Sequence, residues 1–152
     1  MPPDRLRIPR LTLDVPVVPV GMVPALRGEA AAFASPAMPR GKVAGWLNSS
    51  ASFDQPGNIV LTGRHQAAGL TVFHNLWTLE AGDEIILSAG GQSQRYLVAQ
   101  VEIVPEQDQP IEVRLANAQY IRPTEDERLT IITGWPEKGN SHRTIVIAFP
   151  EE

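Results

Sequence analysis

Cysteine is absent from this chain of 152 residues. Without a thiol, a disulfide framework, a zinc–thiolate site and a cysteine nucleophile are all excluded. No apolar run reaches the roughly 18 residues that a membrane-spanning helix requires. A net charge of −4 and the lack of an arginine-rich stretch argue against a nucleic-acid partner.

The first residues lack the features of a secretion signal. Pro2 and Pro3 are followed by arginines at positions 5, 7 and 10, and no apolar segment stands where a signal peptide needs one. The two prolines are typical of the end of a linker. We therefore expect the soluble part of a longer exported protein, which meets a membrane only through segments absent from this sequence.

The composition predicts a single all-β domain over residues 1–152. Hydrophobic residues make up 43% and charged residues 20%, both close to the average of globular domains. The 14 prolines are scattered, and most apolar runs are short and rich in Val, Ile and Thr, which favours strands. Seven or eight such runs, with only small helices, predict a closed all-β barrel. The predicted strands cover residues 6–8, 15–20, 43–46, 58–63, 84–88, 94–104, 129–133 and 144–149.

Proline and glycine mark where strands end or turn. Gly90 and Gly91 predict a tight hairpin turn. Pro16 and Pro19 have no amide hydrogen, so the strand that contains them is expected at an edge or irregular. Residues 24–41 are rich in Ala, Pro and Gly, which predicts a loop with one helical turn. Apolar spacing predicts a short helix over residues 71–79 and a weaker one over 114–120.

Several short motifs follow one another along the chain. RIP at 7–9 and DVPV at 14–17 precede VAGW at 43–46 and QPGNIVLTG at 55–63. VFHNL at 72–76 and LEAGDEI at 79–85 come next, and LTIIT at 129–133 and SHRTIVIA at 141–148 come last. In order and spacing these motifs resemble those of the sortases, cysteine transpeptidases that anchor proteins at bacterial surfaces.

The resemblance implies a fold, a mechanism and a location. It implies an eight-stranded barrel with a groove for a sorting peptide, at the extracytoplasmic face of a bacterial cell. In the family's mechanism, a cysteine thiolate attacks a Thr–Gly amide, a histidine protonates the leaving amine and an arginine stabilises the oxyanion. An incoming amine then resolves the acyl-enzyme.

Two of these three catalytic positions are substituted in this chain. The cysteine position holds Gly134 and the histidine position holds Arg64, whereas Arg143 keeps the arginine. Glycine cannot form a covalent intermediate. Arginine, with a pKa above ~12, is a poor general acid and no general base. Oxyanion stabilisation by Arg143 alone would leave only residual catalysis.

We therefore predict a catalytically inactive sortase-fold protein that binds its ligand without cleaving it. Two guanidinium groups favour a carboxylate or a phosphate, which each can grip through two hydrogen bonds. The expected ligand is a sorting-signal-like peptide or an anionic group of the cell envelope, and no metal or cofactor is expected. The predicted groove consists of Arg64, His65, Thr133, Gly134, Trp135, His142 and Arg143.

Other interpretations of single residues remain open. His65 could act as a displaced catalytic histidine, but a one-residue shift on a strand turns a side chain to the other face, so a surface imidazole is the simpler interpretation. Thr133 or Ser141 could replace the cysteine only beside a base, and the sequence indicates none. Arg143 could be an ordinary cation at a strand end.

The remaining charged residues also have simple explanations. Arg64 could pair with Asp54 or Glu137 in a salt bridge. The acidic residues at positions 102, 106, 108, 112 and 125–127 resemble the loops where some sortases bind calcium, but a loose acidic run is more often a solvated face.

Two alternative functions belong to other classes. The chain could be a sortase-type transpeptidase or hydrolase, either inactivated in the laboratory by a cysteine-to-glycine change or working through a substitute nucleophile. It could also be a structural module of a larger envelope protein, without any ligand.

Overall fold

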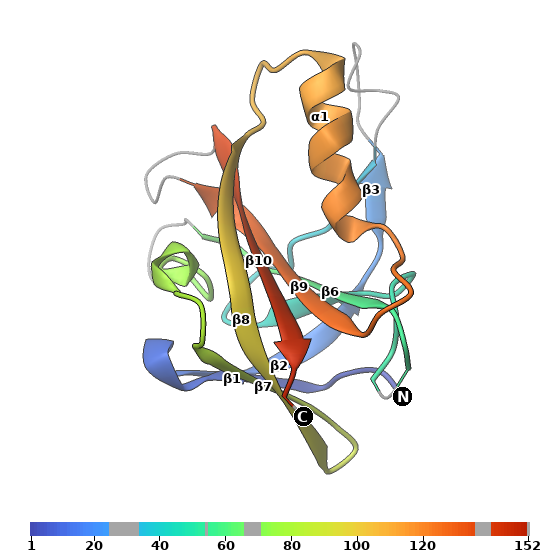
Figure 1. Cartoon of the computed structure of the whole chain (residues 1–152), viewed down its shortest axis with the longest axis vertical. Helices are drawn as coiled ribbons and strands as arrows, with labels where there is room; N and C mark the ends of the chain where they lie inside the picture. Colours follow the sequence, from blue (N-terminus) through green and yellow to red (C-terminus); the bar gives the residue numbers. More distant parts are fainter. Residues whose placement is uncertain (25–33, 54, 66–70, 136–140, 152) are drawn as a thin grey trace.

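The strands of the chain close into one barrel (Figure 1). The computed structural model describes residues 1–24, 34–53, 55–65, 71–135 and 141–151. Eight strands pair in the closed order β1-β2-β5-β6-β9-β10-β8-β7, which confirms the predicted all-β barrel. They are β1 (Arg5–Ile8), β2 (Leu13–Val20), β5 (Ala44–Leu47), β6 (Asn58–Thr62), β7 (Glu84–Ala89), β8 (Gln92–Pro105), β9 (Arg128–Trp135) and β10 (His142–Pro150).

Short elements flank the barrel. Within the described ranges they comprise one α-helix, three 3-10 turns and a separate two-stranded sheet. They are α1 (Ile111–Ala118), η1 (Pro9–Leu11), η3 (Leu76–Thr78), η4 (Gln119–Ile121), β3 (Met22–Pro24) and β4 (Ala34–Pro36).

The short elements differ from the sequence prediction in three places. The helix predicted over residues 71–79 is only the single turn η3, because Val72, Phe73 and Leu76 are already buried against the barrel core by a series of turns. The weaker helix begins earlier than predicted, at Ile111, and its end tightens into η4. The predicted loop over 24–41 contains β4, which pairs with β3, while residues 25–33 lie outside the described residues.

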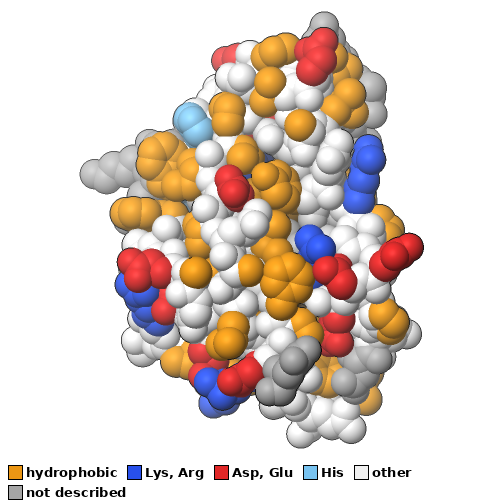
Figure 2. All heavy atoms as spheres, in the orientation of Figure 1, with side chains coloured by type: hydrophobic (Ala, Val, Ile, Leu, Met, Phe, Trp, Pro, Cys, Tyr) orange, Lys and Arg blue, Asp and Glu red, His pale blue; other side chains and the backbone are white. Residues whose placement is uncertain are grey.

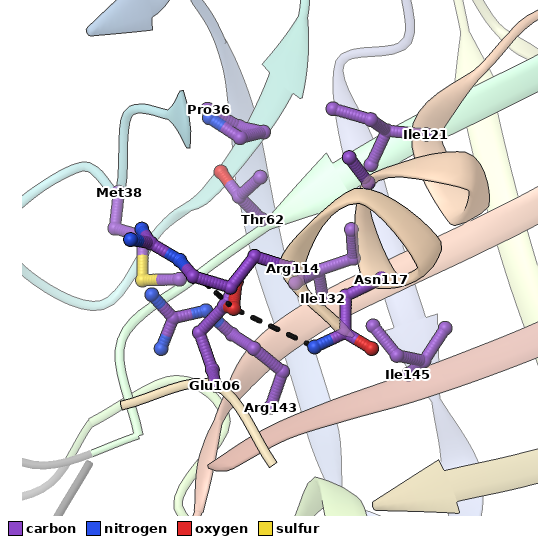
Figure 3. A pocket seen from close by; sticks show the side chains of 11 residues that line it. Pro36, Met38, Thr62, Glu106, Arg114, Asn117, Ile121, Ile132, Arg143 and Ile145 are labelled. Carbon is purple, nitrogen blue, oxygen red and sulfur yellow. Dashed lines mark hydrogen bonds and ion pairs between the residues drawn. The ribbon is translucent and has the colours of Figure 1, made fainter. Parts of the chain in front are cut away.

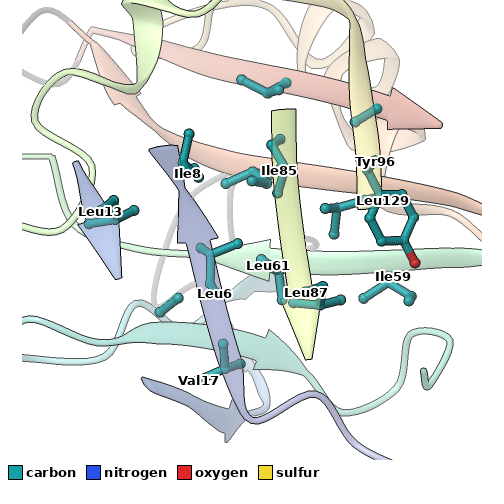
Figure 4. Close-up of a cluster of buried hydrophobic side chains, with 14 of the residues drawn as sticks. Leu6, Ile8, Leu13, Val17, Ile59, Leu61, Ile85, Leu87, Tyr96 and Leu129 are labelled. Carbon is teal, nitrogen blue, oxygen red and sulfur yellow. The ribbon is translucent and has the colours of Figure 1, made fainter. Parts of the chain in front are cut away.

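Alternation along the strands produces two apolar layers. One layer fills the barrel, and Figure 4 shows Leu6, Leu61, Ile85, Leu87 and Leu129 converging there. The other layer lies on the outer face of β6, β9 and β10 and is partly covered by η4. Its residues are Leu47, Val60, Ile132, Ile145 and Ile147, against which Val104, Tyr120 and Ile121 pack.

The prolines of β2 fit a closed barrel because the two halves of that strand pair on opposite sides. Residues 13–16 pair with β1, whereas residues 17–20 pair with β5 in parallel. The amide of Val17 donates to the carbonyl of Asp4, so alternate amides point to β1. The nitrogens of Pro16 and Pro19 therefore fall where no partner strand requires a donor. Because β2 lies between β1 and β5 in the closed barrel, the expectation of an edge strand is wrong, whereas the alternative of an irregular strand agrees with its divided pairing.

The hairpin between β7 and β8 has the predicted turn. Gly90 and Gly91 both have positive φ, 56° and 86°, which residues with a Cβ rarely adopt. The long strand β8 then continues to Pro105, at the border of the segment that leads into α1.

Asn58 fastens the end of the α1–η4 segment to the barrel. Its side-chain amide donates to the carbonyl of Tyr120 at 2.9 Å and to that of Arg122 at 3.1 Å. The hydroxyl of Thr130 donates to its Oδ1 at 2.7 Å. Because Asn58 and Thr130 are buried, water has little access to these bonds, which hold η4 against the outer apolar layer.

Replacing Asn58 with alanine is expected to lower the free energy of unfolding by about 2–3 kcal/mol, because two backbone carbonyls and the buried hydroxyl of Thr130 lose their partner. Urea unfolding measures the change. Asn48→Ala, which removes an exposed amide, is the control and should alter stability by less than ~0.5 kcal/mol. Equal effects of the two substitutions would contradict the anchoring role of Asn58.

Candidate functional site

A pocket opens on the outer face of the barrel, between the ends of β6, β9 and β10 and the segment that carries α1. It is partly open to solvent, and its cavity volume is about 80 Å³, smaller than the roughly 300–1,000 Å³ of most ligand pockets. Figure 3 shows the charged side chains at one end and isoleucines at the other. The lining residues are Pro36, Met38, Thr62, Glu106, Arg114, Asn117, Ala118, Ile121, Ile132, Arg143 and Ile145.

The register of β9 and β10 places Gly134 and Arg143 together. The two residues are direct partners in the antiparallel ladder. Ile132 and Ile145, two residues away on each strand, belong to the outer layer and line the pocket, so Gly134 and Arg143 face the same side. The two positions that the family resemblance assigned to nucleophile and arginine are therefore adjacent.

Two further charged residues meet Arg143. Glu106, which follows β8, lies 3.6 Å from Arg114 of α1, measured from Oε2 to Nε. Both side chains are mostly buried, with 21% and 26% of their surface exposed. Asn117, one turn along α1, donates to the carbonyl of Pro105 at 2.7 Å and has its Nδ2 3.5 Å from Glu106 Oε2.

Burial dominates the electrostatics of Arg143. It lowers the pKa of this guanidinium, Glu106 opposes that change, and the like charge of Arg114 adds to it. Arginine nevertheless keeps its proton in proteins, so the pocket holds a permanent cation with reduced access to water. A carboxylate or phosphate that replaced the lost water contacts would be stabilised there.

The polar segments around the charged end are linked by backbone hydrogen bonds. The amides of Glu106 and Gln107 both donate to the carbonyl of Ser141 at 3.0 Å. A second hollow, lined by Gln107 and Asp108 together with Glu106, Arg114 and Arg143, adjoins the pocket. The segment between β8 and α1 is thus tied to Ser141, the residue before β10.

Three of the seven predicted groove residues lie on the opposite face of the sheet. Thr133, Trp135 and His142 alternate with Gly134 and Arg143 along β9 and β10. The hydroxyl of Thr133 donates to the carbonyl of Gly63 at 2.6 Å and is buried, so it serves the barrel interior. Trp135 and His142 contact each other edge to face, with ring centroids 5.4 Å apart. The structure therefore separates these three side chains from the pocket.

Arg64 and His65 follow the end of β6. Arg64 is half-buried, and among the described residues its Nε is buried without a hydrogen-bond partner. It is not among the described residues that line the pocket of Arg143. Its two suggested salt-bridge partners, Asp54 and Glu137, lie outside the described residues. His65 is 6% exposed, so the expectation of a surface imidazole is wrong. Two residues earlier, Gly63 packs closely on Phe73, which places this segment against the core.

Ser141 has a base beside it, which the sequence did not indicate. Its Oγ lies 2.7 Å from Nδ1 of His142. Because His142 belongs to the face that Trp135 occupies, this pair is separated from Arg143 by the sheet.

Sequence reasoning also missed the partners of Arg143. Glu106 was assigned to a solvated acidic run, and Arg114 and Asn117 to a weak helix. The spacing of Arg114 and Asn117, three residues apart on one helix face, was an available signal. No signal in the sequence indicated their position over Arg143, because that position depends on how α1 folds back on the barrel.

The described residues offer neither a metal-binding cluster nor a membrane-spanning helix. Within them, no group of three or more His, Cys, Asp or Glu side chains could hold a metal ion. Likewise, none of the helices described is long and apolar enough to cross a bilayer.

Comparisons with known proteins agree on one family. The family model described as Sortase domain matches residues 6–151. No curated protein matches the chain. Among solved structures, sortase C-1 from Actinomyces oris has a TM-score of 0.69 at 23% identity, with 97% of this chain and 73% of that chain covered.

Two further structures have the same fold. A lid mutant of sortase A from Corynebacterium diphtheriae has a TM-score of 0.70 at 23% identity, covering 97% of this chain and 69% of that one. Sortase A from Listeria monocytogenes has a TM-score of 0.68 at 20% identity, covering 98% and 86%. With the match of the family model over nearly its whole length, the chain belongs to the sortase family.

Proposed function

We propose that this chain is a catalytically inactive sortase that binds a peptide or an anionic cell-envelope group through the pocket of Arg143. The observation that carries the proposal is the pairing of Gly134, which has no side chain, with a mostly desolvated arginine on the same face. Sortases act at the bacterial cell surface, and we propose an extracytoplasmic location for this chain as well.

The loss of covalent chemistry follows from the residues themselves. The sequence contains no cysteine, so no thioester with a sorting peptide can form. At the position that the resemblance assigns to histidine, Arg64 cannot deliver a proton to a leaving amine at neutral pH. What remains is binding and electrostatic stabilisation, which without a nucleophile leave little rate enhancement.

The composition of the pocket supports a ligand with both a charged and an apolar part. Arg143 and Arg114 provide cationic donors at one end, and Ile132, Ile145 and Ile121 line the other. An extended peptide with an apolar side chain near a carboxylate would match both ends. A phosphate-bearing envelope group would use the charged end alone.

Arg143→Gln is expected to weaken binding about tenfold or more, since a charge-assisted hydrogen bond contributes about 1.5–3 kcal/mol. Titration calorimetry with a sorting-signal-like peptide and, separately, with inorganic phosphate measures this. The control is Arg7→Gln, which removes an exposed arginine on β1 outside the pocket lining. Absence of binding to the unaltered protein, or an equal loss in both variants, would contradict the proposal.

A second candidate function is ester or amide hydrolysis by Ser141 with His142 as base. The observation that favours it is the 2.7 Å contact between Oγ and Nδ1, which is within the range needed for proton transfer. Against it stands the placement of Arg143 on the other face of the sheet, which leaves this pair without that cation to stabilise an oxyanion.

Hydrolysis of p-nitrophenyl acetate separates the two candidates. Because the pair lacks an oxyanion donor from Arg143, we expect the unaltered protein, Ser141→Ala and His142→Gln to give the same rate. A rate at least ~100-fold above that of both variants would instead establish the serine as a nucleophile, since general-base assistance contributes about that much. Thr133→Val, which alters a buried hydroxyl bonded to a backbone carbonyl, is the control.

A further inference from the structure

The pocket of Arg143 already contains a carboxylate of the chain itself. Glu106 lies at the charged end with Arg114 and Arg143, and Figure 3 shows the three side chains gathered there. We infer that Glu106 is an internal ligand of the two arginines, which an external carboxylate or phosphate must displace. The inference rests on the proposed function, because it concerns how the same pocket is opened to its ligand.

The backbone of Glu106 is held firmly. Its amide and that of Gln107 donate to Ser141 at 3.0 Å, and Asn117 donates to the carbonyl of Pro105 at 2.7 Å. These bonds link the end of β8 to β10 and to α1. Displacement of the carboxylate therefore requires a rotation of the side chain and no movement of the strand.

The side chain of Glu106 is held loosely by comparison. Its Oε2 is 3.6 Å from Arg114 Nε and 3.5 Å from Asn117 Nδ2. Strong charge-assisted hydrogen bonds measure about 2.7–2.9 Å, so both contacts are long. With 21% of its side chain exposed, Glu106 is also accessible from the solvent. A ligand that gripped both arginines at shorter distances would replace weak contacts with strong ones.

The charges around Glu106 determine the direction of the effect. Arg114 faces it from α1 and Arg143 from β10, and both Glu106 and Asp108 line the adjoining hollow. Among the described residues, two cations and two acids therefore line this hollow. Neutralising Glu106 removes one negative charge from beside the two arginines, which favours an incoming anion. Arg114 and Arg143 also repel each other: besides the burial that lowers the pKa of Arg143, Arg114 lowers it further, whereas Glu106 raises it.

The chemistry of the displacing group follows from the donors. Guanidinium groups match the planar carboxylate and the phosphate, each through paired hydrogen bonds. The isoleucines beside them favour a carboxylate that follows an apolar side chain. A peptide ending in leucine with a free carboxylate tests the first source, and inorganic phosphate tests the second.

Glu106→Gln is expected to bind the leucine-ending peptide about fivefold to tenfold more tightly than the unaltered protein does, by removal of the internal competitor. Titration calorimetry gives the affinities, and the same peptide with an amidated C-terminus should not gain. Phosphate, titrated separately, should also bind Glu106→Gln more tightly than the unaltered protein if the two arginines are sufficient to bind an anion. Glu125→Gln, which removes an exposed acid without a contact in the described structure, is the control and should bind as the unaltered protein does.

A second variant guards against a folding defect in Glu106→Gln. Glu106→Asp keeps the charge but shortens the side chain, so its affinity for the leucine-ending peptide should rise less, by about twofold to threefold. Thermal unfolding of each variant in chloride and in phosphate buffer provides a further readout. Phosphate should raise the unfolding temperature of Glu106→Gln more than that of Glu125→Gln, because only the former removes the carboxylate beside Arg114 and Arg143.

The outcomes distinguish this inference from the proposed function. Tighter anion binding by Glu106→Gln supports both. Equal affinity in Glu106→Gln and the unaltered protein overturns the internal ligand but leaves the binding function intact. Weaker binding by Glu106→Gln means that Glu106 contacts the ligand, which also overturns the inference. Absence of binding to every form overturns both.

Discussion

The antiparallel register of β9 against β10 is the constraint on which the pocket depends. It pairs Gly134 with Arg143 and puts both on the face that carries Ile132 and Ile145. A slip of one residue would send these isoleucines into the barrel and the interior residues outward, which the packing of both faces forbids. The arginine keeps its place beside the glycine because the two apolar layers demand that register, whether or not catalysis occurs there.

Polar links then bring the α1 segment over this face. Asn58 holds the carbonyl groups of Tyr120 and Arg122, and the carbonyl of Ser141 holds the amides of Glu106 and Gln107. Each link joins the long segment between β8 and β9 to a barrel strand or its border. The apolar surface of η4 adds a hydrophobic contribution.

Figure 2 shows apolar side chains spread between charged ones over the face of the molecule that Figure 1 presents.

The predicted strands agree well with the structure because each is a short run of β-branched and apolar residues ended by glycine, proline or polar residues. The hairpin at Gly90 and Gly91 is local chemistry and needs no tertiary information. The helix over 71–79 was overpredicted because apolar spacing of three and four residues also fits a series of buried turns. Thr133, Trp135 and His142 are separated from Arg143 because successive residues of a strand point to opposite faces. The predicted groove combined neighbouring residues without regard to this alternation.

The sequence by itself determined that no thiol chemistry is possible, since an absent cysteine cannot be restored by folding. It also determined the barrel, because strand length, turn residues and motif order can each be recognised from short stretches of the sequence. Only the tertiary structure decided which groups surround Arg143. Glu106 and Arg114 reach it across 37 and 29 residues of chain (143 − 106 and 143 − 114), through the pairing of β8 with β10 and the return of α1. Contacts of that range depend on long-range packing, which no local pattern of residues specifies.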